Sequence, residues 1–223
     1  MAVERGFMSI AIPSSLDTSH PADVVRWAAD AFGLDNLVVT ASFEDAVLVH
    51  VAATAVPGIE VTLLDTQYLF AETQWLVDEL TKKLDLNLRV VRPLPEIVPD
   101  NLWQTDIEAC CNVRKVEPLN RAIAGKQAWL TGIRRADGPT RADAPIAAYD
   151  IGRGLVKVNP LAALSDDDMA LYVRLHDLPV HPLLDKGYFS IGCWPCTRPT
   201  APGDDKRAGR WSGNAKTECG LHV

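Results

Sequence analysis

Four of the five cysteines stand in two close groups, Cys110-Cys111 and Cys193-Trp-Pro-Cys196. A Cys-x-x-Cys turn supplies two of the four soft ligands that a metal or iron–sulfur site needs. Adjacent cysteines are a less common contribution, because neighbouring side chains diverge unless the backbone turns sharply. The spacing leaves open an iron–sulfur cluster, a zinc site such as a ribbon, a thioredoxin-type redox pair at Cys193 and Cys196, and reduced cysteines in the core.

The fifth cysteine, Cys219, lies between Lys216 and His222 in a polar tail. Nearby cations lower the pKa of a thiol and make the thiolate available near neutral pH. We therefore interpret Cys219 as a nucleophile; the alternative is an inert cysteine near the end of the chain.

Several arginines and one lysine have the chemistry to bind an anion. Guanidinium groups are planar, permanently charged forks that fit phosphate or sulfate oxygens. Lys115 follows Cys111 by four residues, so it can lie near both a cluster and an anion. Each arginine taken singly also fits a surface salt bridge. The candidates are Lys115, Arg134, Arg135, Arg207 and Arg210.

These side chains need a scaffold, and the first part of the chain predicts one. Short apolar runs alternate with helical patterns, which indicates an α/β fold with an open, mainly parallel sheet and helices on both faces. In such sheets, ligands bind beyond the carboxyl ends of the strands. Residues 40–42, 65–66 and 132–135 follow predicted strands and should converge. We predict strands at 37–41, 59–64, 88–91 and 128–131, and helices at 21–33, 46–55 and 66–84.

The pattern changes beyond Pro160. Ser165 with the three following aspartates predicts a capped helix that runs to about His176. From Asp177 onward the chain is irregular, yet it keeps aromatic residues and three cysteines. A long irregular tail of this composition is interpreted as functional.

The composition excludes several classes of protein. The chain has 223 residues, 48% hydrophobic residues and a net charge of −7, which describes a globular domain and argues against nucleic-acid binding. It has no apolar run long enough for a membrane span and no export signal, and its odd number of cysteines indicates a reducing compartment. We therefore expect a cytoplasmic protein with no membrane or nucleic-acid partner; a homo-oligomer stays open. Residues 186–223 carry six basic and three acidic residues, so this tail can close over a small anion or be ordinary solvated charge.

With these residues laid out, the chain resembles the assimilatory sulfonucleotide reductases, in particular the adenosine 5′-phosphosulfate (APS) reductases that carry an iron–sulfur cluster. The resemblance runs from about Val38 to His222. It rests on Cys110-Cys111-Asn-Val-Arg114-Lys115, Ile191-Gly-Cys193-Trp-Pro-Cys196, Arg207-Ala-Gly-Arg210-Trp211 and Lys216-Thr-Glu-Cys219-Gly-Leu-His222, with Leu64-Asp65-Thr66 and Thr131-Gly-Ile-Arg134-Arg135 in support.

The resemblance implies an adenine nucleotide α-hydrolase-like fold in a single domain, residues 1–223. It implies that Cys219 is the catalytic nucleophile. It also implies that the four paired cysteines, Cys110, Cys111, Cys193 and Cys196, ligate a [4Fe–4S] cluster. Substrate would be bound by Lys115, Arg207, Arg210 and His222 around the phosphosulfate and by Ser42, Asp65, Thr66, Arg134 and Arg135 around the nucleotide.

The reaction implied is reduction of APS to sulfite and AMP in sulfate assimilation, through a thiosulfonate on Cys219 that thioredoxin or a similar dithiol resolves. Because Cys219 must meet both substrate and reductant, we expect residues 199–223 to form a mobile segment with a hinge at 199–213. Two positions depart from the family pattern: Ser42 stands where glycine is usual, and Gln67-Tyr68 replaces a glycine-containing continuation.

Three other functions stay open at this stage. A 3′-phosphoadenosine 5′-phosphosulfate (PAPS) reductase shares the nucleophilic tail but typically lacks the four cluster cysteines. An adenylyl-transfer enzyme of the related pyrophosphatase fold would need a glycine-rich phosphate loop, which is absent here. A non-enzymatic zinc-binding module would be colourless, whereas a cluster is brown.

Overall fold

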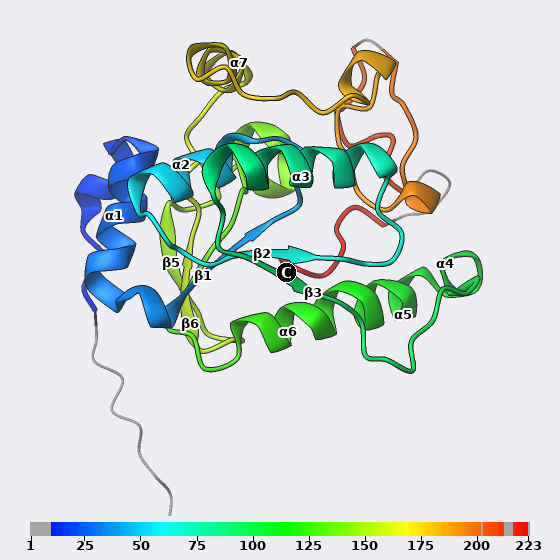
Figure 1. Ribbon diagram of the computed structural model, residues 1–223, viewed down its shortest axis with the longest axis horizontal. Coiled ribbons are helices and arrows are strands. Elements are labelled where there is room, and N and C mark those ends of the chain that lie inside the picture. Colours follow the sequence, from blue (N-terminus) through cyan, green and yellow to red (C-terminus); the bar gives the residue numbers. More distant parts are fainter. Residues whose placement is uncertain (1–9, 202, 212–215, 223) are drawn as a thin grey trace, which may run out of the picture.

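The computed structural model describes residues 10–201, 203–211 and 216–222 (Figure 1). None of the described helices is long and apolar enough to cross a membrane. The strands are β1 (Leu37–Ala41), β2 (Val61–Leu64), β3 (Leu88–Val91), β4 (Ala128–Leu130), β5 (Ala147–Asp150) and β6 (Leu155–Val158). The helices are α1 (Pro21–Phe32), α2 (Val47–Ala55), α3 (Ala71–Leu84), α4 (Leu102–Thr105), α5 (Ile107–Cys111), α6 (Glu117–Ile123) and α7 (Asp166–Leu175).

The six described strands form one open sheet in the order β3-β2-β1-β4-β6-β5. The first five are parallel, and only β5 runs antiparallel, paired with β6. β1 is central, since Val39 is in register with Val61 of β2 and with Leu130 of β4. The chain order reverses between β1 and β4, and such a switch point opens a crevice for ligands at the carboxyl ends of the strands.

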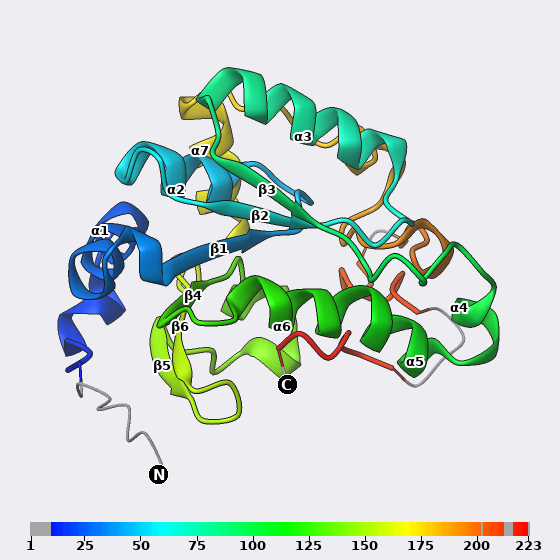
Figure 2. The same ribbon diagram turned by 60° about the horizontal axis from the view of Figure 1, so that its bottom comes forward.

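Helices cover both faces of the sheet, as Figures 1 and 2 show. Helices α1, α2 and α3 lie on one face, with α7 beyond α2, and α5 and α6 lie on the other. The larger core lies under α1–α3 and includes Val39, Val49 and Leu76. A smaller core under α6 contains Val38, Leu119 and Trp129, and Leu221 of the C-terminal segment packs against it. The expected α/β architecture is thus confirmed.

The strand predicted at 59–64 begins at Val61, and some other predicted ends are off by one residue. The larger differences between the local predictions and the structure are three. The helix expected from residue 66 begins at Ala71, because the Asp65 carboxylate accepts a hydrogen bond from the Gln67 N–H and Gln67 adopts a left-handed φ of 66°. The β5–β6 hairpin was not predicted. Helices α4, α5 and α6 were not predicted either.

The missed helical region contains an irregularity that explains why its pattern is hard to read. Between α5 and α6 the residues Asn112–Val116 form a π-helical turn. The three segments therefore make one continuous helix that is wider in its middle. Such a turn inserts an extra residue and interrupts the 3.6-residue period. Cys110 and Cys111 lie just before it, and Arg114 and Lys115 lie within it.

Candidate active site

A cleft of about 730 Å³ opens at the carboxyl ends of the parallel strands. The segments that follow β1, β2 and β4 meet there, as the sequence predicts, and contribute Ser42, Thr66 and Arg134. The C-terminal segment closes another side with Arg207, Arg210, Cys219 and His222. The cleft therefore gathers residues that are far apart in the sequence, from Thr40 to His222, around one cavity.

The turn after β1 is built without glycine. Phe43 takes the left-handed conformation, with φ of 53°, and its side chain is buried in the core. A bulky residue accepts this strained backbone only where packing determines it. The Ser42 hydroxyl accepts the Glu44 N–H at 3.4 Å, and Val47 N–H donates to the Asp45 carboxylate at 2.7 Å.

Cys219 is 9% exposed and packs against Cys111 and Trp211. Its sulfur thus lies in a protein-lined recess of the cleft, beside one of the paired cysteines. A thiol in this position can reach a bound molecule in the cleft, but it is closed to a large partner from outside. The described C-terminal segment, residues 216–222, is seated in its inward arrangement.

Trp211 organises the positive charge around Cys219. Its buried ring is approached by four cations, with Arg210 at 4.7 Å, Arg207 at 5.7 Å, and Lys115 and Lys216 each at 5.9 Å from the ring centroid. An indole face attracts such charges and holds them without neutralising them. Arg207 and Lys216 are also paired with the carboxylates of Glu218 and Glu108, so Arg210 and Lys115 contribute most of the positive charge next to the thiol, which favours binding of an anion.

Arg210 is held in place by close packing. It donates to the Ser190 hydroxyl at 3.2 Å, and its guanidinium lies so near Gly192 that a Cβ there would be 2.2 Å from Nη2. Gly209 is needed for a similar reason, since a Cβ would lie 2.0 Å from the Arg198 carbonyl oxygen. Gly192 permits the close approach of a side chain, and Gly209 permits the close approach of another part of the backbone.

The four paired cysteines line a second, small cavity. All four are free thiols; Cys110, Cys111 and Cys193 are buried and Cys196 is partly exposed. Burial raises the pKa of Cys110 to about 11, and the neighbouring Cys111 and Cys193 sulfurs act in the same direction. Burial also raises the pKa of Cys111 and of Cys196. Buried thiols that face one cavity in this way need a positive ion or cluster to stabilise their thiolate forms.

The donor set, four thiols that line one cavity, has the chemistry of a site for an iron–sulfur cluster or a zinc ion. Structural zinc draws four ligands to bonds of about 2.3 Å around one point. Among the residues that the structure describes, no three His, Cys, Asp or Glu side chains are placed to hold one ion in this way. The four cysteines face one small cavity, and which group they would hold stays a prediction.

Lys115 connects the two cavities, since it lines both of them, as does Cys193. Lys115 is buried, and burial acts to lower its pKa, but the Cys193 and Cys219 sulfurs outweigh that effect and raise it. The ammonium group is therefore fully charged. The π-helical turn presents it toward the cleft while the preceding cysteines face the smaller cavity.

One acidic side chain in the cleft was missed by sequence reasoning. Glu44 lies in the turn after β1, and burial raises its pKa to about 7, although the Arg210 charge acts to lower it. Asp45 and Asp137 repel the same carboxylate, and the Ile191 N–H donates to it. Glu44 therefore exchanges a proton near neutral pH inside an anion-binding cleft. An acidic residue after a strand carries no special signal in a sequence.

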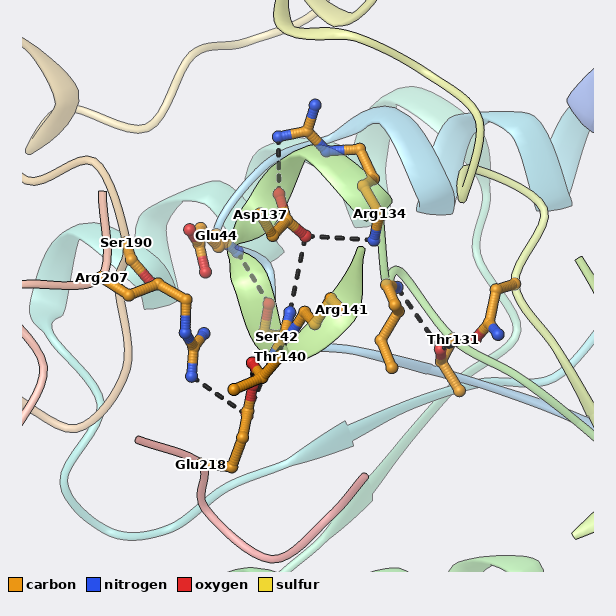
Figure 3. Close-up of polar contacts among 12 residues, drawn as sticks. Ser42, Glu44, Thr131, Arg134, Asp137, Thr140, Arg141, Ser190, Arg207 and Glu218 are labelled. Atoms are coloured by element: carbon orange, nitrogen blue, oxygen red, sulfur yellow. Dashed lines mark hydrogen bonds and ion pairs between the residues drawn. The ribbon is translucent and has the colours of Figure 1, made fainter. Parts of the chain in front are cut away.

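The loop after β4 holds two arginines around one aspartate (Figure 3). Asp137 pairs with Arg134 at 2.7 Å and with Arg141 at 3.5 Å, and Arg134 also pairs with Asp166 at 3.0 Å. Arg134 is thus at the cleft, as expected, but its charge is shared with two carboxylates. Arg141 also lines the cleft and was not singled out by the sequence.

His222 lies flat on Trp129, with ring centroids 5.5 Å apart and planes 12° apart. Burial, followed by the charges of Lys157 and Arg141, lowers the pKa of His222 well below its ordinary value. The imidazole is therefore neutral. Its Nδ1 is buried with no hydrogen-bond partner among the described residues, which leaves it available to a molecule in the cleft.

Two of the expected substrate contacts lie away from the cleft. The Asp65 carboxylate accepts from Gln67 N–H at 2.9 Å and pairs with Arg92 at 2.9 Å. Arg135 donates from Nε to the Ala144 carbonyl at 2.9 Å. Neither side chain lines the cavity, so their part in nucleotide binding stays a prediction. The other expected contacts, Ser42, Thr66, Lys115, Arg134, Arg207, Arg210 and His222, all line it.

Comparison with known proteins decides the family. The family model for the phosphoadenosine phosphosulfate reductase domain matches residues 36–199. The chain belongs to the phosphoadenosine phosphosulfate reductase family. It is 45% identical to the adenosine 5′-phosphosulfate reductase of Mycolicibacterium smegmatis, over 99% of this chain and 93% of that protein. The corresponding enzyme of Rhodococcus opacus is 42% identical, over 94% of this chain and 91% of that protein.

Solved structures agree with this family. The phosphoadenylyl-sulfate reductase of Candida auris superposes with a TM-score of 0.71 at 26% identity, over 85% of this chain and all of that one. An FMN adenylyltransferase of Candida glabrata, only 12% identical, has a TM-score of 0.58 over 86% of this chain and 70% of its own. This second likeness shows a shared fold.

Proposed function

We propose that this chain reduces adenosine 5′-phosphosulfate to sulfite and AMP in sulfate assimilation, with Cys219 as the nucleophile. The observation that carries the proposal is the position of Cys219, in the recess of a strand-end cleft beside four cations gathered on Trp211. An anionic thiolate must approach an anionic sulfuryl group, and this cationic group offsets their repulsion. The adenosine 5′-phosphosulfate reductases among the relatives supply the choice of substrate.

The first step forms a bond between the Cys219 sulfur and the sulfur of the substrate. The bond from that sulfur to the bridging phosphate oxygen breaks, and its electron pair leaves with AMP. Lys115, Arg207 and Arg210 stabilise the charge that grows on the leaving oxygens. His222 is neutral, so its Nδ1 can form a hydrogen bond with the substrate without adding a charge beside these cations.

The second step needs an external dithiol, for which thioredoxin is the proposed donor. Its thiolate attacks the Cys219 sulfur and expels sulfite, leaving a mixed disulfide that its second thiol resolves. The two electrons of the dithiol thus reduce sulfate-level sulfur to sulfite, and Cys219 is regenerated. We also propose a cytoplasmic location, because Cys219 must stay reduced between turnovers.

Residues 199–223 must change position between the two steps, since Cys219 is nearly enclosed in the arrangement described here. We propose that this segment of the single domain swings out to present the sulfonated cysteine to the dithiol. Residues 202, 212–215 and 223 of the segment, including parts of the expected hinge at 199–213, lie outside the described residues.

Cys110, Cys111, Cys193 and Cys196 would hold a [4Fe–4S] cluster. When bound, the cluster supplies a fixed electrostatic and structural centre that ties α5 to the turn at residues 193–196. Lys115 and Cys193 then stay at the wall shared by the two cavities. Both electrons of the reaction come from the dithiol. Iron and acid-labile sulfide analysis of anaerobically purified protein tests this assignment, with a Cys193→Ser variant as control.

The decisive experiment is incubation of the purified protein with labelled APS and no dithiol. Mass spectrometry should find one SO₃ group on the Cys219 peptide and an equivalent amount of released AMP. The Cys219→Ser variant should carry no label but still bind AMP. An active wild-type protein whose Cys219 peptide stays unmodified would overturn the mechanism. A parallel assay with PAPS tests the alternative substrate.

A further inference from the structure

Glu218, the residue before the nucleophile, is anchored by four hydrogen bonds to its side chain. Both carboxylate oxygens of Glu218 accept two hydrogen bonds each. Arg141 donates to Oε1 at 2.9 Å and to Oε2 at 3.0 Å, Thr140 donates to Oε1 at 3.1 Å, and Arg207 donates to Oε2 at 3.1 Å (Figure 3). This satisfies the four acceptor positions of a carboxylate.

These groups are largely removed from solvent. The side chains of Glu218, Arg141 and Arg207 are 12%, 13% and 14% exposed. Burial acts to raise the pKa of Glu218, but the hydrogen bond and charge of Arg141 lower it below its ordinary value, so the carboxylate is ionised. A bidentate, buried pair of this kind is costly to break by removing one partner.

Arg207 also serves the cleft. It lines the cavity, lies against Trp211 and donates from the same Nη2 to the Thr217 carbonyl at 2.9 Å. An anionic substrate in the cleft therefore competes with Glu218 for the guanidinium group of Arg207. Arg141 comes from the loop after β4 and makes the bidentate contact, so it can keep the segment seated while Arg207 turns toward the substrate.

We infer that Glu218 is a positioning residue that holds Cys219 in the cleft through Arg141, and that its release from Arg141 and Arg207 exposes the sulfonated cysteine. This inference rests on the proposed function. The docked carboxylate aligns the thiol for attack, and after transfer the new anionic SO₃ group competes with it for Arg207. Opening then exchanges the buried Glu218 contacts for water and delivers Cys219 to the dithiol.

The test compares Glu218→Gln with the wild-type holoenzyme in two assays. The first measures the single-turnover rate of SO₃ transfer from APS to Cys219 without dithiol. The second, without APS, measures the rate at which iodoacetamide alkylates Cys219, read from the Cys219 peptide. We expect transfer to slow and alkylation to accelerate, each by about tenfold or more, because an amide cannot satisfy two guanidinium donors in a buried site.

Matched variants separate positioning from general damage. Glu218→Asp keeps the charge, so its transfer rate and its alkylation rate should both lie between those of Glu218→Gln and those of the wild type. Arg141→Lys keeps a cation but loses the bidentate contact, and it should change both rates as Glu218→Gln does. Glu79→Gln removes an exposed ion pair with Lys82 on α3, neither residue of which lines the cleft, and both rates should stay within about twofold of wild type. Affinity for AMP, which reports folding of the cleft, should stay within about threefold in Glu218→Gln.

Two results would overturn the inference: transfer at the wild-type rate in both Glu218→Gln and Arg141→Lys, or slowed transfer with unchanged alkylation, which would place Glu218 in the chemistry instead of docking. A wild-type protein with no SO₃ on Cys219 would remove the proposed function. The alkylation assay needs no substrate, so it would still decide whether Glu218 closes the segment.

Discussion

The hydroxyl of Thr66 lies 3.3 Å from the sulfur of Cys193, and both groups are buried. Thr66 belongs to the segment after β2 that lines the nucleotide cleft, and Cys193 lines both cavities. A single contact thus links the strand-end turn to the cysteine cavity. The same hydroxyl accepts the Tyr68 N–H at 3.3 Å, which fixes its direction.

The first prediction concerns this contact. Thr66→Val keeps the shape of the side chain but removes the hydroxyl. If Cys193 holds the proposed cluster, we expect kcat/KM for APS to fall about tenfold, as is typical when a group that orients a metal ligand is lost. Iron content should fall with it. Thr66→Ser keeps the hydroxyl and should stay close to wild type. Equal kinetics and iron content in the valine variant would show that the contact has no role.

The second prediction concerns the cations around the thiol. Arg210→Ala and Lys115→Ala should each slow sulfite release at least about tenfold, because preorganised donors to a leaving oxygen typically contribute 10²–10³ in rate. Lys82→Ala, an exposed lysine on α3, is the control. Steady-state kinetics with a saturating dithiol measure the effect. If either variant keeps its wild-type kcat/KM, that residue does not stabilise the transition state.

The third prediction follows from Glu44. Its carboxyl is protonated below about pH 7 and ionised above it, beside Asp45 and Asp137, with Arg210 as the opposing charge. An anionic nucleotide binds the neutral form better, so binding takes up a proton and KM for APS should rise as the pH passes upward through 7. Glu44→Gln cannot ionise, so its KM should be flat over this range. A wild-type KM with no slope there, or an equal slope in the glutamine variant, would contradict this role.

The fourth prediction uses Gly192 to move Arg210 without deleting it. In Gly192→Ala the new methyl would lie 2.2 Å from Nη2 of Arg210, so the flexible guanidinium must shift while the backbone stays in place. We expect the thermal midpoint to change little but activity to fall about as far as in Arg210→Ala. Gly152→Ala, whose Cβ would make an ordinary contact at 3.5 Å, is the matched control. Full activity of the Gly192 variant would show that the position of Arg210 is not critical.

The sequence predicted the parts of the fold that have a clean local pattern. The strands at 37–41 and 88–91 were predicted with their observed bounds, and the capping box that Ser165 forms with Asp168 begins α7 as expected. The β5–β6 hairpin has short strands with little alternation, so its existence depends on pairing along the edge of the sheet. Helices α5 and α6 were missed because the π-helical turn between them breaks the helical period.

The residues of the site also divide into those that the sequence could single out and those that it could not. Cysteines and basic residues could be singled out because their chemistry is specific, and most of the expected substrate contacts line the cleft. Glu44 and Glu218 could not, since acidic residues in an anion-binding site contradict the simple rule of opposite charges. Their roles depend on burial and on the arginines that face them, and both are properties of the folded chain.

The π-helical turn at Asn112–Val116 sets the angle about the helix axis between the side chains before it and those within it. Each residue of an α-helix turns its side chain by about 100°, so removing one residue from the turn would rotate the cysteine pair by that angle relative to Lys115. The cysteine sulfurs and the ammonium group of Lys115 would then face different directions, although every one of these amino acids would still be present. The bulge therefore makes the exact length of this segment, as well as its composition, a condition of activity.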